Sequence, residues 1–116
     1  MAIGIGVGVS ASLITSPRPT GGNVPINTVA PFASGTFVSG QTVTCTTGTW
    51  TSNAGAISYA YQWKRDGSPI GGATNSTYVL TASDTSAITF LCTVTATNTA
   101  GSATADSNNM AALLPP

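Results

Sequence analysis

The feature that most constrains the fold is an alternation of inward and outward positions, repeated in short runs along the chain. A period of two is that of a β-strand, in which successive side chains point to opposite faces. The clearest run spans 88–96, and its expected inward face consists of Ile88, Phe90, Cys92, Val94 and Ala96. The pattern therefore predicts a strand here with one buried face.

Similar runs recur between turn signals, and no window keeps the helical spacing of apolar residues. Pro31 and Gly35 interrupt the first run, which suits a bent strand at a sheet edge. Asp66-Gly67 predicts a tight hairpin turn. About seven short strands at this spacing indicate an all-β sandwich. The expected strand regions are 29–38, 41–46, 59–65, 68–70, 77–81, 88–96 and 102–107.

Charged residues are scarce, with three basic and three acidic side chains and no histidine in 116 residues. This charge is too low for a nucleic-acid interface or for attraction to an anionic membrane. The abundant Ser and Thr hydroxyls lack a histidine base, and the carboxylates form no pair in the sequence. We therefore expect no enzyme activity, no catalytic residue, no cofactor and no metal site. A surface with so little charge is easier to understand if a partner covers much of it.

The spacing of Cys45, Trp63 and Cys92 resembles the immunoglobulin fold. In that fold, two cysteines face each other across the sheets and a tryptophan packs against them. The sequence most closely resembles the Ig-like modules of bacterial surface proteins and tailed-phage virion proteins. The segments that carry this similarity are 40–45, 48–50, 61–67, 70–74, 76–81 and 92–98. The resemblance covers roughly residues 27–107 and implies an Ig-like β-sandwich.

The resemblance implies a core around Trp63, Phe90, Tyr78 and Leu80. Antibody-type domains carry a tyrosine two residues before the second cysteine, whose hydroxyl anchors a chain corner. Phe90 occupies that position here, so we expect Asp84 and packing to hold the corner instead.

The cysteine pair has two interpretations. A disulfide between Cys45 and Cys92 would stabilise the fold by on the order of 3–4 kcal/mol. Two buried thiols are expected if the chain folds in a reducing cytoplasm.

Composition divides the chain into three parts: an arm at 1–22, the sandwich at 23–108 and an apolar tail at 109–116. The arm has no positively charged start, so we expect mature structure rather than a signal peptide. Its alternation with glycine suits a strand that adds to a sheet edge of another subunit, although it could also fold back on its own domain. The expected partner-binding residues are Ile3, Ile5, Val7, Val9, Leu13 and Ile14.

Trp50 lies after the second expected strand, close to Asn53. An exposed indole beside polar side chains could stack on a sugar ring, which would give weak binding to host glycans. The alternative, which we favour, is a hydrophobic plug at the end of the sandwich.

An uncharged Ig-like module with apolar termini resembles the small decoration or accessory proteins of bacteriophage capsids. This implies a structural protein on the capsid surface of the virion, with capsid or other virion proteins as partners and a homo-oligomer as a further option. The resemblance also leaves open an adhesion or carbohydrate-binding module of a bacterial surface or phage tail protein.

Overall fold

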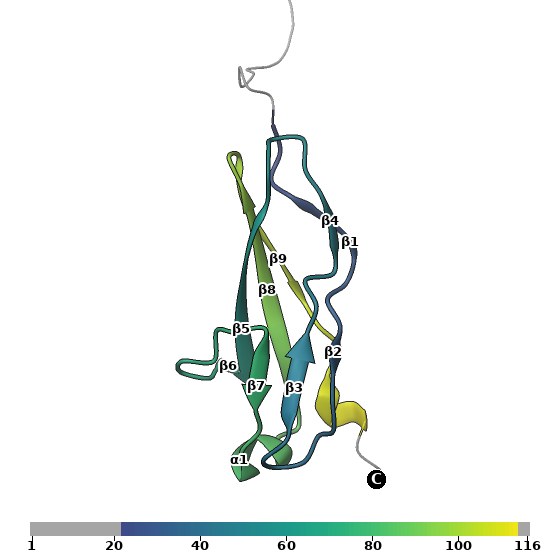
Figure 1. The fold of residues 1–116 in the computed structure, drawn as a ribbon, viewed down its shortest axis with the longest axis vertical. Coiled ribbons are helices and arrows are strands. Elements are labelled where there is room, and N and C mark those ends of the chain that lie inside the picture. Colours follow the sequence, from purple (N-terminus) through teal and green to yellow (C-terminus); the bar gives the residue numbers. More distant parts are fainter. Residues whose placement is uncertain (1–21, 114–116) are drawn as a thin grey trace, which may run out of the picture.

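The computed structural model describes residues 22–113, which form an all-β sandwich of antiparallel strands (Figure 1). This confirms the fold class expected from the sequence. The predicted arm residues Ile3 to Ile14 lie outside the described residues, as do the last three residues of the tail.

One layer is a four-stranded sheet in the order β6-β5-β8-β9. Its central strands are long, because the alternating runs continue without a proline. Trp63 on β5 lies opposite Cys92 on β8. Asp66 and Gly67 have positive φ angles of 51° and 83°, which make the tight turn between β5 and β6. The bounds are β5 Ser58–Arg65, β6 Ser68–Pro69, β8 Phe90–Asn98 and β9 Gly101–Asp106.

The facing layer is a three-stranded sheet in the order β2-β3-β7, and its strands are short. They are β2 Ala33–Ser34, β3 Thr42–Cys45 and β7 Thr77–Val79. Val43 and Cys45 are buried on the inner face of β3, as their alternation predicts, while Thr42 and Thr44 are exposed.

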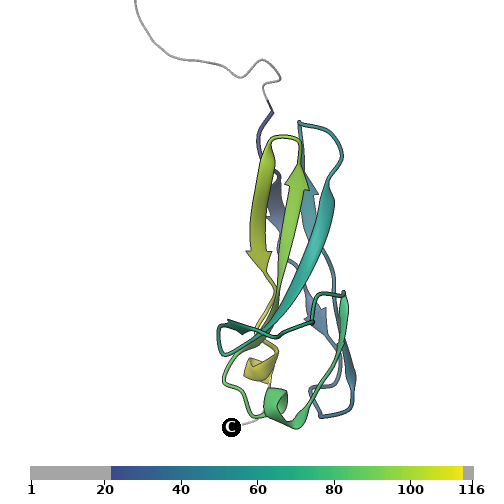
Figure 2. The same cartoon turned by 90° about the vertical axis from the view of Figure 1, so that its left-hand side faces the viewer.

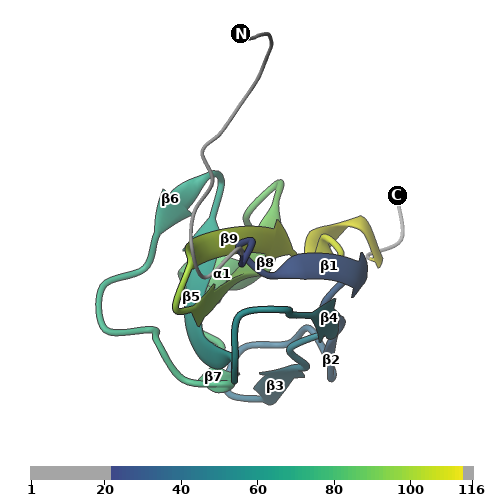
Figure 3. The same cartoon turned by 90° about the horizontal axis from the view of Figure 1, so that it is seen from above.

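A two-stranded ribbon closes one side of the sandwich (Figure 3). It pairs β1 Ile26–Val29 with β4 Thr49–Thr51, and β1 also lies beside β9. The sequence did not predict β4, because Gly48-Thr49-Trp50 looked like a loop. Gly48 has a φ of 75°, and a Cβ there would collide with the Val29 carbonyl oxygen. A glycine is therefore required where the chain enters β4.

Two short helices correct the expectation that the sandwich contains none. Helix α1 spans Ala82–Thr85, and the 3-10 helix η2 spans Met110–Leu113. Both are about one turn long, too short to leave a helical period in the sequence. Met110 is fully buried against the core, although the sequence placed it in the tail.

The core lies between the two layers and centres on aromatic rings. Trp63 and Phe90 are fully buried, with ring centroids 5.6 Å apart, and Leu80 is 2% exposed. Tyr78 is half-buried and packs against Trp63 at a centroid distance of 6.1 Å. The prediction that Ile88 lies on the inward face of a strand is wrong. Strand β8 begins only at Phe90, and Ile88 is 83% exposed in the preceding turn.

The described chain enters and leaves at opposite ends of the sandwich (Figure 2). Gly22 lies at what we call the entry end, together with the β8–β9 turn. It is buried, and a Cβ at this position would collide with that of Ala54. Helices α1 and η2 lie at the other end, which we call the α1 end. The two termini of the described chain therefore lie far from each other.

Candidate functional site

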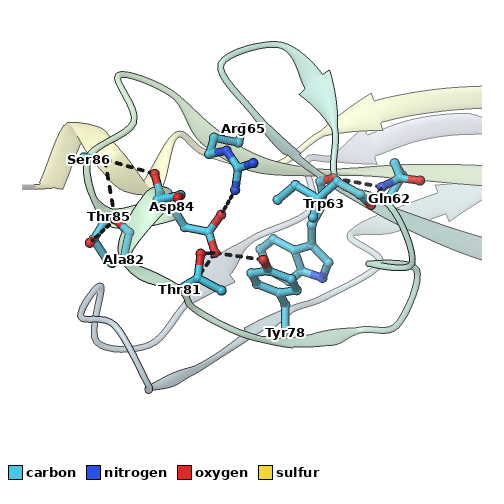
Figure 4. A network of polar contacts seen from close by, with 11 residues as sticks. Gln62, Trp63, Arg65, Tyr78, Thr81, Ala82, Asp84, Thr85 and Ser86 are labelled. Atoms are coloured by element: carbon cyan, nitrogen blue, oxygen red, sulfur yellow. Dashed lines mark hydrogen bonds and ion pairs between the residues drawn. The ribbon is translucent and has the colours of Figure 1, made fainter.

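The most polar buried group in the described residues is the carboxylate of Asp84, at the corner between β7 and β8 (Figure 4). Its side chain is 0% exposed and forms an ion pair with Arg65 from β5. The Tyr78 hydroxyl donates to Asp84 Oδ2 (2.8 Å), as do the Thr81 backbone N–H (2.8 Å) and hydroxyl (2.9 Å). Asp84 thus holds the corner, as the sequence led us to expect from the missing tyrosine anchor.

The electrostatics of this cluster stabilise the charged carboxylate. Burial acts to raise the pKa of Asp84, but hydrogen bonds from Thr81, Tyr78 and Arg65 outweigh it and hold the pKa below its ordinary value. Burial and the bond to Asp84 raise the pKa of Tyr78. The sequence analysis assigned no role to Arg65. Every group in the cluster is satisfied by another, so we interpret it as a structural anchor.

Asp66 performs a second structural task in the adjacent turn. Its Oδ1 accepts the backbone N–H groups of Ile88 (2.8 Å) and Thr89 (3.0 Å). These bonds tie the β5–β6 hairpin to the start of β8. The carboxylate is therefore engaged as a turn clamp, which extends the turn role expected from the Asp-Gly pair.

Cys45 and Cys92 face each other from the two layers as free, buried thiols. Their relative exposures are 2% and 0%. The hydrogen bond with Cys92, together with burial, raises the pKa of Cys45 well above its ordinary value. A thiol in this state is a poor nucleophile, and the pair is placed where a disulfide would join the layers.

Trp50 does not offer the exposed ring that a sugar contact requires. It is 9% exposed and belongs to the hydrophobic core. Its indole N–H donates to the Thr47 carbonyl at 2.6 Å. Burial of the ring favours the plug interpretation, because the faces that would stack on a sugar are covered by protein.

Asn53 lies apart from that ring, at the entry end. Its Oδ1 accepts the backbone N–H of Asn23 (2.9 Å). It also borders a shallow hollow of about 150 Å³, lined in addition by Asn23, Val24, Ile26, Thr51 and Ser52. Asn53 therefore organises the segment that leads out of the arm, and the structure does not bring it together with Trp50 as a shared site.

Exposed apolar side chains gather on the segment that follows the arm. Val24, Ile26, Val29 and Phe32 are 39%, 57%, 58% and 56% exposed, and we call them the apolar row. The bulge in β1 between Asn27 and Val29 turns Val29 outward. The sequence analysis missed this row, because its members are not evenly spaced along the chain.

A second hollow on the described surface lies along β7. It has a volume of about 370 Å³, and its lining comes from β7 and from the loop that precedes it. The loop contributes mainly small residues, and the lining consists of Gly71, Gly72, Ala73, Thr74, Asn75, Thr77, Tyr78 and Val79. No charged group lies among them, so this hollow offers only backbone groups and small or uncharged side chains.

Within residues 22–113 no group of three or more His, Cys, Asp or Glu side chains could hold a metal ion. No helix in that range is long and apolar enough to cross a membrane. Comparisons of the chain with protein families, curated proteins and solved structures found no match.

Proposed function

We propose that the protein is a structural protein of a bacteriophage virion, a decoration or accessory protein on the capsid surface. In this proposal the apolar arm, residues 1–22, attaches to the shell and the Ig-like sandwich projects from it. The partners are capsid or other virion proteins, and further copies of the chain.

The observation that carries this proposal is the uncharged character of one part of the molecule. No charged residue occurs from 19 to 63, a range that includes β1, β2, β3 and β4. The apolar row lies in the same range, directly after the arm. Exposed apolar side chains in a charge-free setting are typical of surfaces that a protein partner covers.

The strand order supports the Ig-like assignment. The order β6-β5-β8-β9 corresponds to C′-C-F-G of that fold, and β2-β3-β7 corresponds to A-B-E. Cys45 then lies on strand B, Trp63 on strand C and Cys92 on strand F. These are the positions that the resemblance in the sequence implies.

The proposed mechanism is burial of apolar surface. Each Å² of apolar surface removed from water contributes roughly 25 cal/mol. A charge-free face needs no ion pairs across the contact, and a charged partner group would be buried there without a counter-charge. The contact should therefore be made with an uncharged, apolar part of the shell and should persist at high salt.

The test is sedimentation of virus particles with the purified full-length chain. We expect the wild-type chain to sediment with particles, and a variant with Leu13 and Ile14 replaced by Ser to remain in solution. A matched control replaces Ser10 and Ser12 by Asn. Particle binding that survives in the variant without Leu13 and Ile14 would contradict attachment through the arm. Binding of the wild-type chain to a glycan array, without sedimentation with particles, would favour an adhesion module instead.

A further inference from the structure

Strand β7 presents an open edge. The Cys45 N–H donates to the Ser76 carbonyl (2.8 Å), and the Leu80 N–H donates to the Gln41 carbonyl (2.9 Å). Backbone groups in an antiparallel ladder alternate in direction, so those of Thr77 and Val79 point away from β3. Within residues 22–113 no strand pairs with β7 on that side.

This edge carries no proline, no charge and no bulge, which are devices by which proteins block unwanted pairing, although β7 is only three residues long. Such devices include prolines, charges, bulges and very short strands. Pro69 lies on the edge strand β6, Asp106 lies on β9, β1 has its bulge, and β2 is two residues long. The sequence of β7 is Thr77-Tyr78-Val79, and Val79 is 57% exposed. An unprotected edge of this kind is a template for another strand.

The groove of about 370 Å³ lies beside this open edge. Its far side is formed by Gly71, Gly72 and Ala73, which leave room for a backbone to approach. In constant-type Ig domains the sheet continues past strand E to a strand D, giving the order A-B-E-D. Here the loop 70–76 leads into β7 without such a strand. The groove therefore lies where a fourth strand would complete the sheet.

We propose that the segment Ile3–Val9 of a neighbouring copy adds to β7 as this fourth strand. Main-chain bonds to Thr77 and Val79 would supply affinity, as in other cases of strand addition. This inference goes beyond the proposed function, because it concerns contacts between copies rather than with the shell. Leu13, Ile14 and the apolar row remain for the shell, so one chain can make both contacts.

The chemistry of the segment matches the groove. In an extended strand, Gly4, Gly6 and Gly8 would lie on one face, which would allow close approach to the small residues of the loop. The alternate residues Ile3, Ile5, Val7 and Val9 would lie on the other face, and they are aliphatic like Val79. Neither the segment nor the groove carries a charge, so pairing buries no unpaired ion.

The geometry of the two ends favours a neighbouring copy over the same chain. The arm joins the sandwich at the entry end, whereas β7 runs toward α1 at the other end (Figure 1). An arm bound to its own β7 would have to turn back along the sandwich. Twenty-one residues precede Gly22, with an extended reach of about 70 Å. The resulting contact is head-to-tail, which generates rings or open chains of copies.

Hydrogen exchange on the purified full-length chain, without particles, tests the inference directly. At high protein concentration we expect the Thr77 and Val79 amides to exchange at least about tenfold more slowly than at high dilution. Analytical ultracentrifugation should show the average mass rising with concentration above the 11.5 kDa of one chain.

Two sets of variants identify the two halves of the contact. Val79→Lys should abolish both the protection and the association, because lysine on an edge opposes strand pairing. Val29→Lys is its matched control, since Val29 is equally exposed on another strand. On the other half, the double variant I5D/V7D should have the same effect as Val79→Lys, whereas S10D/S12D should not. Thr77→Lys provides a second edge variant, and near-ultraviolet circular dichroism checks the fold of each.

Three results would overturn the inference. The first is a Thr77 and Val79 exchange rate that is fast at every concentration. The second is protection that does not depend on concentration, which would show that the arm binds its own chain. The third is association that I5D/V7D leaves unchanged, which would show another occupant. Each can occur whether or not the chain sediments with virus particles, so failure here is distinguishable from failure of the capsid proposal.

Discussion

The two layers of the sandwich differ in almost every property except burial of their inner faces. The four-stranded sheet has central strands of eight and nine residues, and it carries Lys64, Arg65 and Asp106. The three-stranded sheet has strands of two, four and three residues and no charge. Its exposed side chains are Ser and Thr hydroxyls together with the aliphatic Val79.

This difference suggests that one layer stabilises the fold and that the other makes the proposed contacts. Long paired strands hold the four-stranded sheet together, and the Arg65–Asp84 ion pair joins it to the corner at α1. The three-stranded sheet, with its open edge and the adjoining apolar row, is the side on which the proposed contacts lie. A small domain can therefore keep one layer rigid and leave the other available for assembly.

The sharpest test of this separation is the core of the four-stranded sheet. Replacing Trp63 by Ala should lower the free energy of unfolding by about 3–5 kcal/mol, because the ring is fully buried between Tyr78 and Phe90. Val79→Ala in the other sheet should change it by no more than about 0.5 kcal/mol. Urea unfolding measures both. Similar losses in the two variants would contradict the separation.

Oxidation of the cysteine pair should reduce the difference between the two sheets, because the bond would join them. A Cys45–Cys92 disulfide is expected to raise the free energy of unfolding by on the order of 3–4 kcal/mol, mainly by restricting the unfolded chain. Urea unfolding before and after treatment with oxidised glutathione measures the gain, and an intact mass lower by about 2 Da identifies the bond. A Cys45→Ala variant should show neither change. An oxidised protein without added stability would mean that the bond strains the sandwich.

Loss of the Asp84 carboxylate at the corner should lower the free energy of unfolding by less than the preceding changes. Asp84→Asn removes the ion pair and weakens the cap of α1, and we expect a loss of about 2 kcal/mol. The Arg65 side chain is 36% exposed, so water offsets part of the ion-pair term. Asp106→Asn, on an exposed residue, is the control.

The same variant has a defined pH signature. The folded-state pKa of Asp84 lies below its ordinary value of 3.8, so its contribution is complete above that pH. The contribution is lost as the pH falls through the lower folded-state pKa. Unfolding curves of the wild-type protein should therefore show stability falling with acid in this range, and Asp84→Asn should show a weaker dependence. Equal slopes in the two proteins would contradict the role of this carboxylate.

The smallest effect on stability is expected on the apolar row. Ile26→Thr and Val29→Thr should change the free energy of unfolding by no more than about 0.5 kcal/mol, because both side chains are more than half exposed. Particle binding should nevertheless weaken, since apolar contact area is lost. Unchanged binding in the double variant would remove the row from the proposed contact with the shell.

The sequence predicted the long alternating strands well, because residues of a half-buried strand alternate between its buried and exposed faces. It also located Trp63, Phe90 and Leu80 in the core and Asp84 at the corner. It missed β4, since three residues around Trp50 are too few for a period. It also placed Ile88 inside, because alternation alone does not say where a strand begins.

The sequence by itself determined the fold class, the tight turn at Asp66-Gly67 and the absence of charge between residues 19 and 63. These are local properties, set by backbone preferences and by composition. Only the tertiary structure brought Arg65 to Asp84, buried Trp50 and left the edge of β7 open. Such features depend on which strands become neighbours, and non-local pairing is decided by how the whole chain packs.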